Sequence, residues 1–183
     1  QSSITVSHYA LDSHAVRKRE EGRVHLDGFL SYPSAVYTVP YGVMVPKEVG
    51  NLLLPVPVSG SHIGFSTLRM EPCWMAMGQA AGIASALSID GKVKVQNIDL
   101  SRLQDKLVDQ KATLMYFKDV DYTSPHFRMV QYLGLRGYLP EWTARLQEPV
   151  DMATLTAWKK LSGKDLPGIE AGKTTRLVAL EMI

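Results

Sequence analysis

Hydrophobic and polar residues alternate in short runs over the first third of the chain. The runs ITVSHY and RVHLDGFL, both within residues 1 to about 35, alternate well enough to predict short strands. Residues 36–60 also have a β-like pattern, first in YTVPYGVMV and then in NLLLPVPVS, although four prolines argue against central ladder positions there. The continuous apolar run NLLL is typical of a strand buried on both faces.

The pattern then changes from strands to helices. The segment SGSHIGFSTLRMEP is expected to be a loop, and Pro72 is well placed as the first residue of a helix that runs to a C-cap at Gly91. Residues 99–110 predict a second, amphipathic helix, because Leu100, Leu103 and Leu107 share one stripe.

Charged residues return after Lys111 and the pattern becomes one of short helices. These are expected near residues 124–134, 150–162 and from 173 to the end. We therefore predict two domains, residues 1–111 and residues 112–183. The expected fold class is α/β to α+β, with a strand–turn–helix portion in the first domain and a small, mostly helical second domain.

Composition excludes several classes of protein. The 183 residues hold 20 Lys and Arg against 18 Asp and Glu, and 45% are hydrophobic, so global disorder and a polybasic nucleic-acid binder are both excluded. A single cysteine excludes a disulfide scaffold. The longest apolar stretch is interrupted by Gln79 and two glycines, so a buried helix is a better interpretation than a membrane span.

Charge is nearly absent from residues 51–89. Only Arg69 and Glu71 are formally charged in this window of 39 residues. A typical domain is about 25% charged, so nearly ten charges are expected in a window of this length. Such depletion predicts that the window is buried, or that it faces another molecule.

Small residues recur on one face of the predicted helix inside this window. Gly78, Gly82 and Ala86 are spaced four apart, and side chains of this size let another backbone approach closely. Tight packing on a sheet or a ligand is one interpretation. A helix that simply crosses a strand layer is an equally good one.

Three further residues in the window carry chemistry. Arg69 lies just before the helix N-terminus, where an anionic ligand group would be stabilised, although an ion pair with Glu71 or with a distant carboxylate is the simpler alternative. His62 could act as an acid, a base or a hydrogen-bond donor, although a lone histidine is more often structural. Cys73 is best interpreted as a small buried hydrophobe. The spacing of the five histidines supports no metal site.

A family resemblance rests on several motifs in order. The segment PYGVMVPKEVGNLLLPVPVSGSHIGFSTLRMEPCWMAMGQAAGIASALSI resembles the C-terminal part of FAD-dependent oxidoreductases. It is most similar to the bacterial group that carries xanthan-lyase-like names, through an S-x-S-H turn, an L-R-x-x-P step and a G-Q-A-A-G helix. The upstream YALDSH is similar to the Y-x-x-D-S-H stretch of that group, so the resemblance covers residues 8–110.

The resemblance implies roles for particular residues. In such flavoproteins the helix N-terminus faces the pyrimidine edge of the flavin, and the small helix face packs against the nucleotide-binding layer. The resemblance therefore implies FAD as the cofactor and a small-molecule substrate of unknown identity. The cofactor-binding candidates are Ser61, His62, Arg69, Gly78 and Gln79. The catalytic candidates are His62 and, nearer the substrate, Asp12 and His14.

One departure from the family pattern is important. The dinucleotide fingerprint G-x-G-x-x-G is absent, because none of the 14 glycines forms even a G-x-G. We therefore expect a C-terminal portion of a larger enzyme, inactive by itself, whose partner is the missing N-terminal dinucleotide-binding portion. An apolar surface left without that partner also predicts self-association.

The last third of the chain has a weaker resemblance to S-layer homology modules. Its residues in step with that pattern are Phe117, Asp119, Val120, Val130, Leu133, Gly137, Thr175, Arg176 and Ala179. The resemblance implies a cell-wall-binding tail, and the alternative function is therefore a non-enzymatic binding module. Localisation stays open, an exported bacterial protein being one interpretation.

Overall fold

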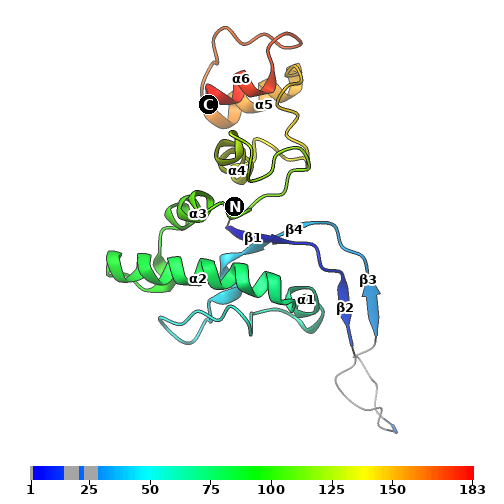
Figure 1. The fold of residues 1–183 in the computed structure, drawn as a ribbon, viewed down its shortest axis with the longest axis vertical. Helices are drawn as coiled ribbons and strands as arrows, with labels where there is room; N and C mark the ends of the chain where they lie inside the picture. Colours follow the sequence, from blue (N-terminus) through cyan, green and yellow to red (C-terminus); the bar gives the residue numbers. More distant parts are fainter. Residues whose placement is uncertain (1, 15–20, 23–28) are drawn as a thin grey trace. The chain divides into compact units, whose positions relative to one another are not determined.

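The chain forms two compact units, Ser2–Leu114 and Met115–Ile183, which Figure 1 shows as ribbons. The structure is a computed structural model, and it describes residues 2–14, 21–22 and 29–183. Each unit is described here by itself.

The strands of the first unit form two small antiparallel sheets. β1 (Ser3–Ser7) pairs with β4 (Tyr37–Pro40), and β2 (Leu11–Ser13) pairs with β3 (Leu30–Tyr32). The strand expected in ITVSHY is confirmed. The strand expected in RVHLDGFL falls mostly on residues 23–28, outside the described residues. Two-stranded antiparallel sheets combined with helices agree with the α+β end of the expected range.

The strand expected through YTVPYGVMV is wrong in its second half. β4 ends at Pro40 and a 3-10 helix, η1 (Tyr41–Met44), follows. Proline has no N–H group, so the ladder cannot continue through Pro40 as a donor. The Tyr41 hydroxyl instead donates to the Val95 carbonyl at 2.9 Å, and burial raises the pKa of Tyr41 to about 12.

The buried strand expected in NLLLPVPVS is also wrong. The segment has no strand structure, and Leu52 keeps 37% of its surface exposed. Its backbone makes separate contacts instead, from the Leu54 N–H to the Met44 carbonyl and from the Ser59 N–H to the Val43 carbonyl. Pro55 and Pro57 have no backbone N–H, so two hydrogen-bond donors are missing from a run of five residues. Too few donors remain to form a β-ladder.

The loop expected between residues 59 and 72 contains a helix. α1 (His62–Leu68) begins at Ser61, whose hydroxyl accepts the Gly64 N–H at 3.0 Å as an N-cap. The expected strand–turn–helix portion is therefore a coil followed by two helices.

The long helix predicted from Pro72 is confirmed. α2 (Glu71–Gly91) has Pro72 in its first turn, where a missing N–H costs nothing. The predicted C-cap is wrong by one residue, since Lys92 rather than Gly91 takes the left-handed conformation (φ 51°). A second 3-10 helix, η2 (Val95–Asn97), then leads to the amphipathic helix α3 (Leu100–Asp109), as predicted, with Asp99 as its N-cap.

The core of the first unit lies between β1, β4, α2 and α3. Gln104 of α3 is anchored to β1 because its side-chain amide donates to the Ser3 carbonyl at 3.0 Å. The fully or nearly fully buried apolar side chains of this core come from all four elements and from the connections, and they are Ile4, Val39, Met44, Met77, Ala80, Ala84, Leu103 and Leu107.

The second unit has three helices, as its pattern predicted. They are α4 (Phe127–Leu135), α5 (Met152–Ser162) and α6 (Arg176–Glu181), with side-chain N-caps at Asp151 and Thr175. This unit has its own hydrophobic core, centred on Trp158, whose indole N–H donates to the Tyr138 carbonyl at 2.7 Å.

Candidate functional site

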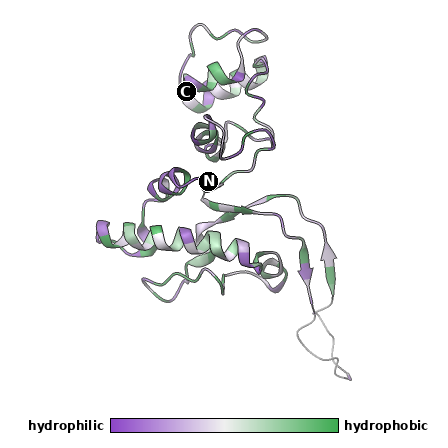
Figure 2. Cartoon of the chain, viewed as in Figure 1, coloured by the Kyte–Doolittle hydropathy of each residue, from purple (hydrophilic) through white to green (hydrophobic). Residues whose placement is uncertain are grey.

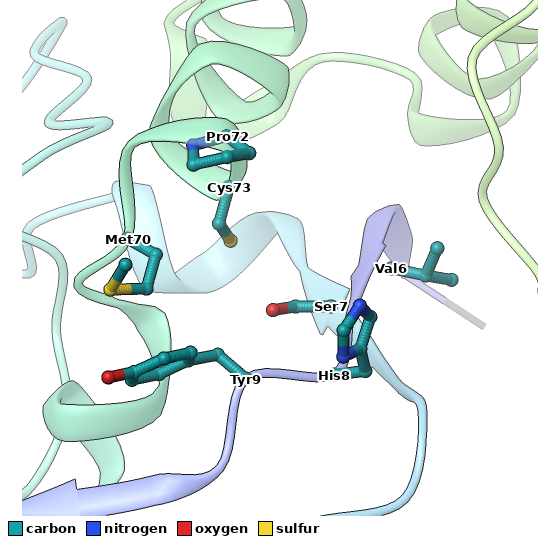
Figure 3. Close-up of a pocket in the computed structure, with 7 residues that line it drawn as sticks. All are labelled: Val6, Ser7, His8, Tyr9, Met70, Pro72 and Cys73. Atoms are coloured by element: carbon teal, nitrogen blue, oxygen red, sulfur yellow. The ribbon is translucent and has the colours of Figure 1, made fainter.

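A cavity of about 270 Å³ opens at the N-terminal end of α2. Figure 3 shows its lining, which comes from the end of β1 and the linker after it, from Met70 before the helix, and from the first turn of α2. The lining residues are Val6, Ser7, His8, Tyr9, Met70, Pro72 and Cys73. An apolar cavity with a few polar groups at one helix end is typical of a cofactor or small-molecule site.

The thiol of Cys73 belongs to the wall of this cavity and is not a reactive group. Cys73 is 6% exposed, and burial raises its pKa, an effect that the nearby Ser7 side chain reduces without cancelling. The thiol therefore stays protonated at neutral pH. This agrees with the interpretation of Cys73, made from the sequence, as a small buried hydrophobic residue.

An ionic cluster lies beside the cavity and shares Tyr9 with it. The Arg69 Nη2 lies 2.5 Å from the Asp12 Oδ2, and the Tyr9 hydroxyl donates to the same carboxylate oxygen at 3.1 Å. The Arg69 guanidinium also lies 5.4 Å from the centroid of the Tyr9 ring. Of the two alternatives that the sequence left open for Arg69, the structure shows the ion pair with a distant carboxylate.

Both histidines of the prediction adjoin this cluster. The His14 Nε2 lies 2.9 Å from the Asp12 Oδ1, and the His14 ring meets Phe29 edge-on with centroids 5.2 Å apart. The His62 Nε2 lies 2.9 Å from the backbone oxygen of His14. Asp12 therefore orients His14, which stays well exposed and free to meet a ligand on its outer side.

Hydrogen bonds from α1 fix the position of the cluster. The Ser66 hydroxyl accepts the Asp12 N–H at 3.3 Å, and the Thr67 hydroxyl donates to the Tyr9 carbonyl. The Tyr37 hydroxyl on β4 donates to the Thr67 carbonyl at 2.7 Å. Because α1 ends at Leu68, these bonds place Arg69 directly against Asp12.

The pKa of Asp12 lies below its ordinary value of 3.8. Desolvation raises this pKa. The hydrogen bond from Tyr9, the charge and hydrogen bond of His14, and the charge of Arg69 lower it, and together they outweigh the effect of desolvation. A carboxyl whose pKa is depressed on folding stabilises the fold above its unfolded pKa. That contribution is lost as the pH falls through the folded value.

We expect Asp12→Asn to lower the thermal midpoint at pH 7. The gap to the wild type should shrink as the pH falls below 3.8, because the unfolded wild-type carboxyl then takes up a proton, and it should close as the pH passes the lowered pKa of the folded carboxyl. Thermal unfolding of both proteins at pH 7 and pH 3 measures this, with the exposed Asp165→Asn as the control. A gap that is equal at both pH values would contradict the role assigned to the cluster.

The remaining predicted residues lie elsewhere. Ser61 is the N-cap of α1, and its hydroxyl accepts the Gly64 N–H. Gln79 is exposed two turns along α2, where its amide donates to the Gln110 side chain at 2.9 Å. Gly78 is in the same part of the helix, and a Cβ added there would meet nothing within 4 Å. The structure thus gathers Asp12, His14, His62 and Arg69, and it does not bring Gly78 or Gln79 to them.

Sequence reasoning missed the residues at the end of β1. Ser7, His8 and Tyr9 line the cavity, although only the strand ITVSHY itself was predicted. Their place in the sequence could have indicated them, because these polar residues lie at the end of a predicted strand, where the following loop often carries binding groups.

Comparison with known proteins identifies the family. The family model for FAD dependent oxidoreductases matches residues 1–107, which is more than half of the chain. The chain therefore belongs to the FAD dependent oxidoreductase family, in which FAD is the cofactor. No curated protein and no solved structure matches it.

The cavity is smaller than a site for a whole dinucleotide. Sites for drug-sized ligands occupy about 300–1,000 Å³, and the cavity of about 270 Å³ lies just below that range. Within the described ranges no helix is long and apolar enough to span a membrane, and no group of three acidic, His or Cys side chains is arranged for a metal ion.

Proposed function

We propose that residues 1–111 form one wall of the flavin site of an FAD-dependent oxidoreductase. The observation that carries the proposal is the cavity at the start of α2, in the part of the chain that the family model covers. FAD, when bound, supplies the hydride or electron transfer, and the protein supplies binding, orientation and electrostatics.

The chain's own groups give this wall a positive character. The N-terminal end of the 21-residue helix α2 points its dipole at the cavity, and a helix N-terminus favours electron-rich or negative ligand atoms. Met70 and Pro72 offer apolar surface for a flat ring, while Ser7 and His8 offer polar groups at its edge. Arg69 contributes indirectly, since its charge is balanced by Asp12 and it holds Tyr9 in place.

We assign the substrate side to the exposed edge of the ionic cluster. His14 is the best acid–base candidate there, because Asp12 fixes one ring nitrogen while 63% of the side chain stays exposed. Asp12 is then a positioning residue, and His62 steadies the backbone of His14. A small-molecule substrate that approaches this edge would reach His14 first.

The absence of G-x-G-x-x-G supports the remaining part of the proposal. The pyrophosphate and ribose of FAD need a dinucleotide-binding portion that this sequence does not contain. The chain is proposed to act as the C-terminal portion of a parent enzyme. The motif order in residues 8–110 supports the narrower placement in the bacterial group with xanthan-lyase-like names.

The parent polypeptide tests the proposal. Purified with its dinucleotide-binding portion, it is expected to show the yellow absorbance of bound flavin. A colourless parent that is correctly folded by circular dichroism would contradict the proposal.

A second function, for residues 112–183, is a binding module of the S-layer homology type. It is supported by a hollow of about 110 Å³ whose lining includes Arg176, the guanidinium of which lies 5.1 Å from the centroid of the buried Trp158 ring. We expect the full chain to sediment with purified cell-wall glycan. A chain that stays wholly in the supernatant would exclude this function.

A further inference from the structure

Tyr9 belongs to both parts of the candidate site. Its ring lines the cavity at the start of α2, and Figure 3 shows the hydroxyl at the end of that ring pointing away from Ser7. The hydroxyl donates to the Asp12 Oδ2 at 3.1 Å, within the ionic cluster. One side chain therefore joins the proposed flavin side to the proposed substrate side.

Hydrogen bonds hold Tyr9 at both of its ends. The Tyr9 carbonyl accepts the Ser34 hydroxyl at 2.9 Å and also the Thr67 hydroxyl. At the other end, the Arg69 Nη2 lies 3.4 Å from the Tyr9 hydroxyl, next to the bond to Asp12. The backbone bonds fix the chain but leave the side chain free to rotate about χ1. The orientation of the ring therefore depends on the contacts of the hydroxyl with Asp12 and Arg69.

The helix side of the cavity is apolar. Figure 2 shows that α2 is coloured mostly white to green, and the residues that line the cavity on this side are Met70, Pro72 and Cys73. Apolar surface binds a flat ring, whereas its orientation is set by a small number of precisely placed groups. A Tyr9 ring held in one position is such a group on the strand side.

The two carboxylate oxygens of Asp12 serve different sides of the site. The Oδ2 atom contacts the Tyr9 hydroxyl and the Arg69 guanidinium, while the Oδ1 atom lies 2.9 Å from the His14 Nε2. Asp12 is not among the residues that line the cavity. Its contact with an occupant of the cavity is therefore indirect, through Tyr9.

We infer that Tyr9 is a positioning residue of the flavin site, whose ring the Asp12 carboxylate holds in the orientation that flavin binding needs. The same carboxylate orients His14, so one residue aligns the flavin side with the substrate side. This inference rests on the proposed function, because it takes flavin as the occupant of the cavity.

A Tyr9 ring released from Asp12 is expected to bind flavin less well. A free side chain divides among about three χ1 rotamers, and apparent affinity falls with the competent fraction, so about a threefold loss is expected. Tyr9→Phe and Asp12→Ala break the same hydrogen bond, and Tyr9→Phe keeps the ring. Each variant alone should show this loss, and the double variant should also show about threefold rather than about ninefold.

Titration of the flavin-stripped parent enzyme with FAD measures the four dissociation constants. The matched controls are Tyr41→Phe, which removes the hydroxyl that donates to the Val95 carbonyl, and Asp99→Ala, which removes the N-cap of α3. Neither residue lines the cavity. Both controls should lower the thermal midpoint and still bind FAD as the wild type does, which is also the result that a merely structural role of Tyr9 and Asp12 would give.

The outcomes separate this inference from the proposed function. An Asp12→Ala variant that binds FAD as tightly as the wild type would overturn the inference alone, and so would a double variant weakened about ninefold. A correctly folded wild-type parent that binds no FAD would overturn both proposals.

Discussion

Ser7→Phe is expected to remove bound flavin from the parent enzyme. Ser7 is at the end of β1 and its side chain lines the cavity, so a phenyl ring there fills much of the space of about 270 Å³. The fold should tolerate the change, because Ser7 is only partly buried and aromatic residues favour strands. We expect flavin affinity to fall at least about tenfold, which corresponds to about 1.4 kcal/mol.

The control for this variant is Ser2→Phe. Ser2 immediately precedes the same strand but is exposed and does not line the cavity. Flavin absorbance per polypeptide, measured after gel filtration, should match the wild type for Ser2→Phe and fall for Ser7→Phe. Full flavin content in Ser7→Phe would show that the cavity is not the flavin site.

Trp158→Ala is expected to have the largest effect on stability. Trp158 is 1% exposed in the core of the second unit, donates to the Tyr138 carbonyl, and lies beneath Arg176. Truncating a buried tryptophan removes about 3–5 kcal/mol, from lost burial and from the cavity left behind. Urea unfolding followed by far-UV circular dichroism measures the loss.

Trp142→Ala provides the matched comparison. Trp142 is 43% exposed, and its ring centroid lies 5.9 Å from the Lys118 ammonium, so the same truncation should cost only about 0.5 kcal/mol. Equal losses of unfolding free energy in the two variants would contradict the placement of Trp158 in the core of this unit.

Helices with a clear pattern were predictable from the sequence. Pro72 marked the first turn of α2, and Leu103 and Leu107 marked the buried stripe of α3. The helix α1 was missed because Gly60 and Gly64 suggested a loop. The helix begins at Ser61, whose hydroxyl accepts the Gly64 N–H as an N-cap.

The strand prediction failed where burial had to be inferred from composition. The run NLLL has the apolar content of a central strand, but a strand also needs partners on both edges. Pro55 and Pro57 prevent that pairing, and the segment runs along η1 through single hydrogen bonds instead. Apolar content alone does not distinguish a strand from an extended coil.

The sequence named four residues that lie together in the structure, Asp12, His14, His62 and Arg69, but it did not predict their pairing or the residues that line the cavity at the end of β1. Arg69 and Asp12 are 57 residues apart in the sequence, so their contact depends on how α1 lies against β2. The low charge of residues 51–89 correctly marked an unusual region. Within that region Met70, Pro72 and Cys73 line the cavity.

Light-driven oxidation by the bound flavin tests the central claim most directly. An illuminated flavin oxidises nearby His, Tyr and Met side chains, and mass spectrometry of the parent enzyme locates the modified residues. A flavin in the cavity predicts that His8, Tyr9 and Met70 are modified first. Modification that leaves His8, Tyr9 and Met70 intact while exposed side chains such as Tyr32, which is 63% exposed, are oxidised would contradict the account.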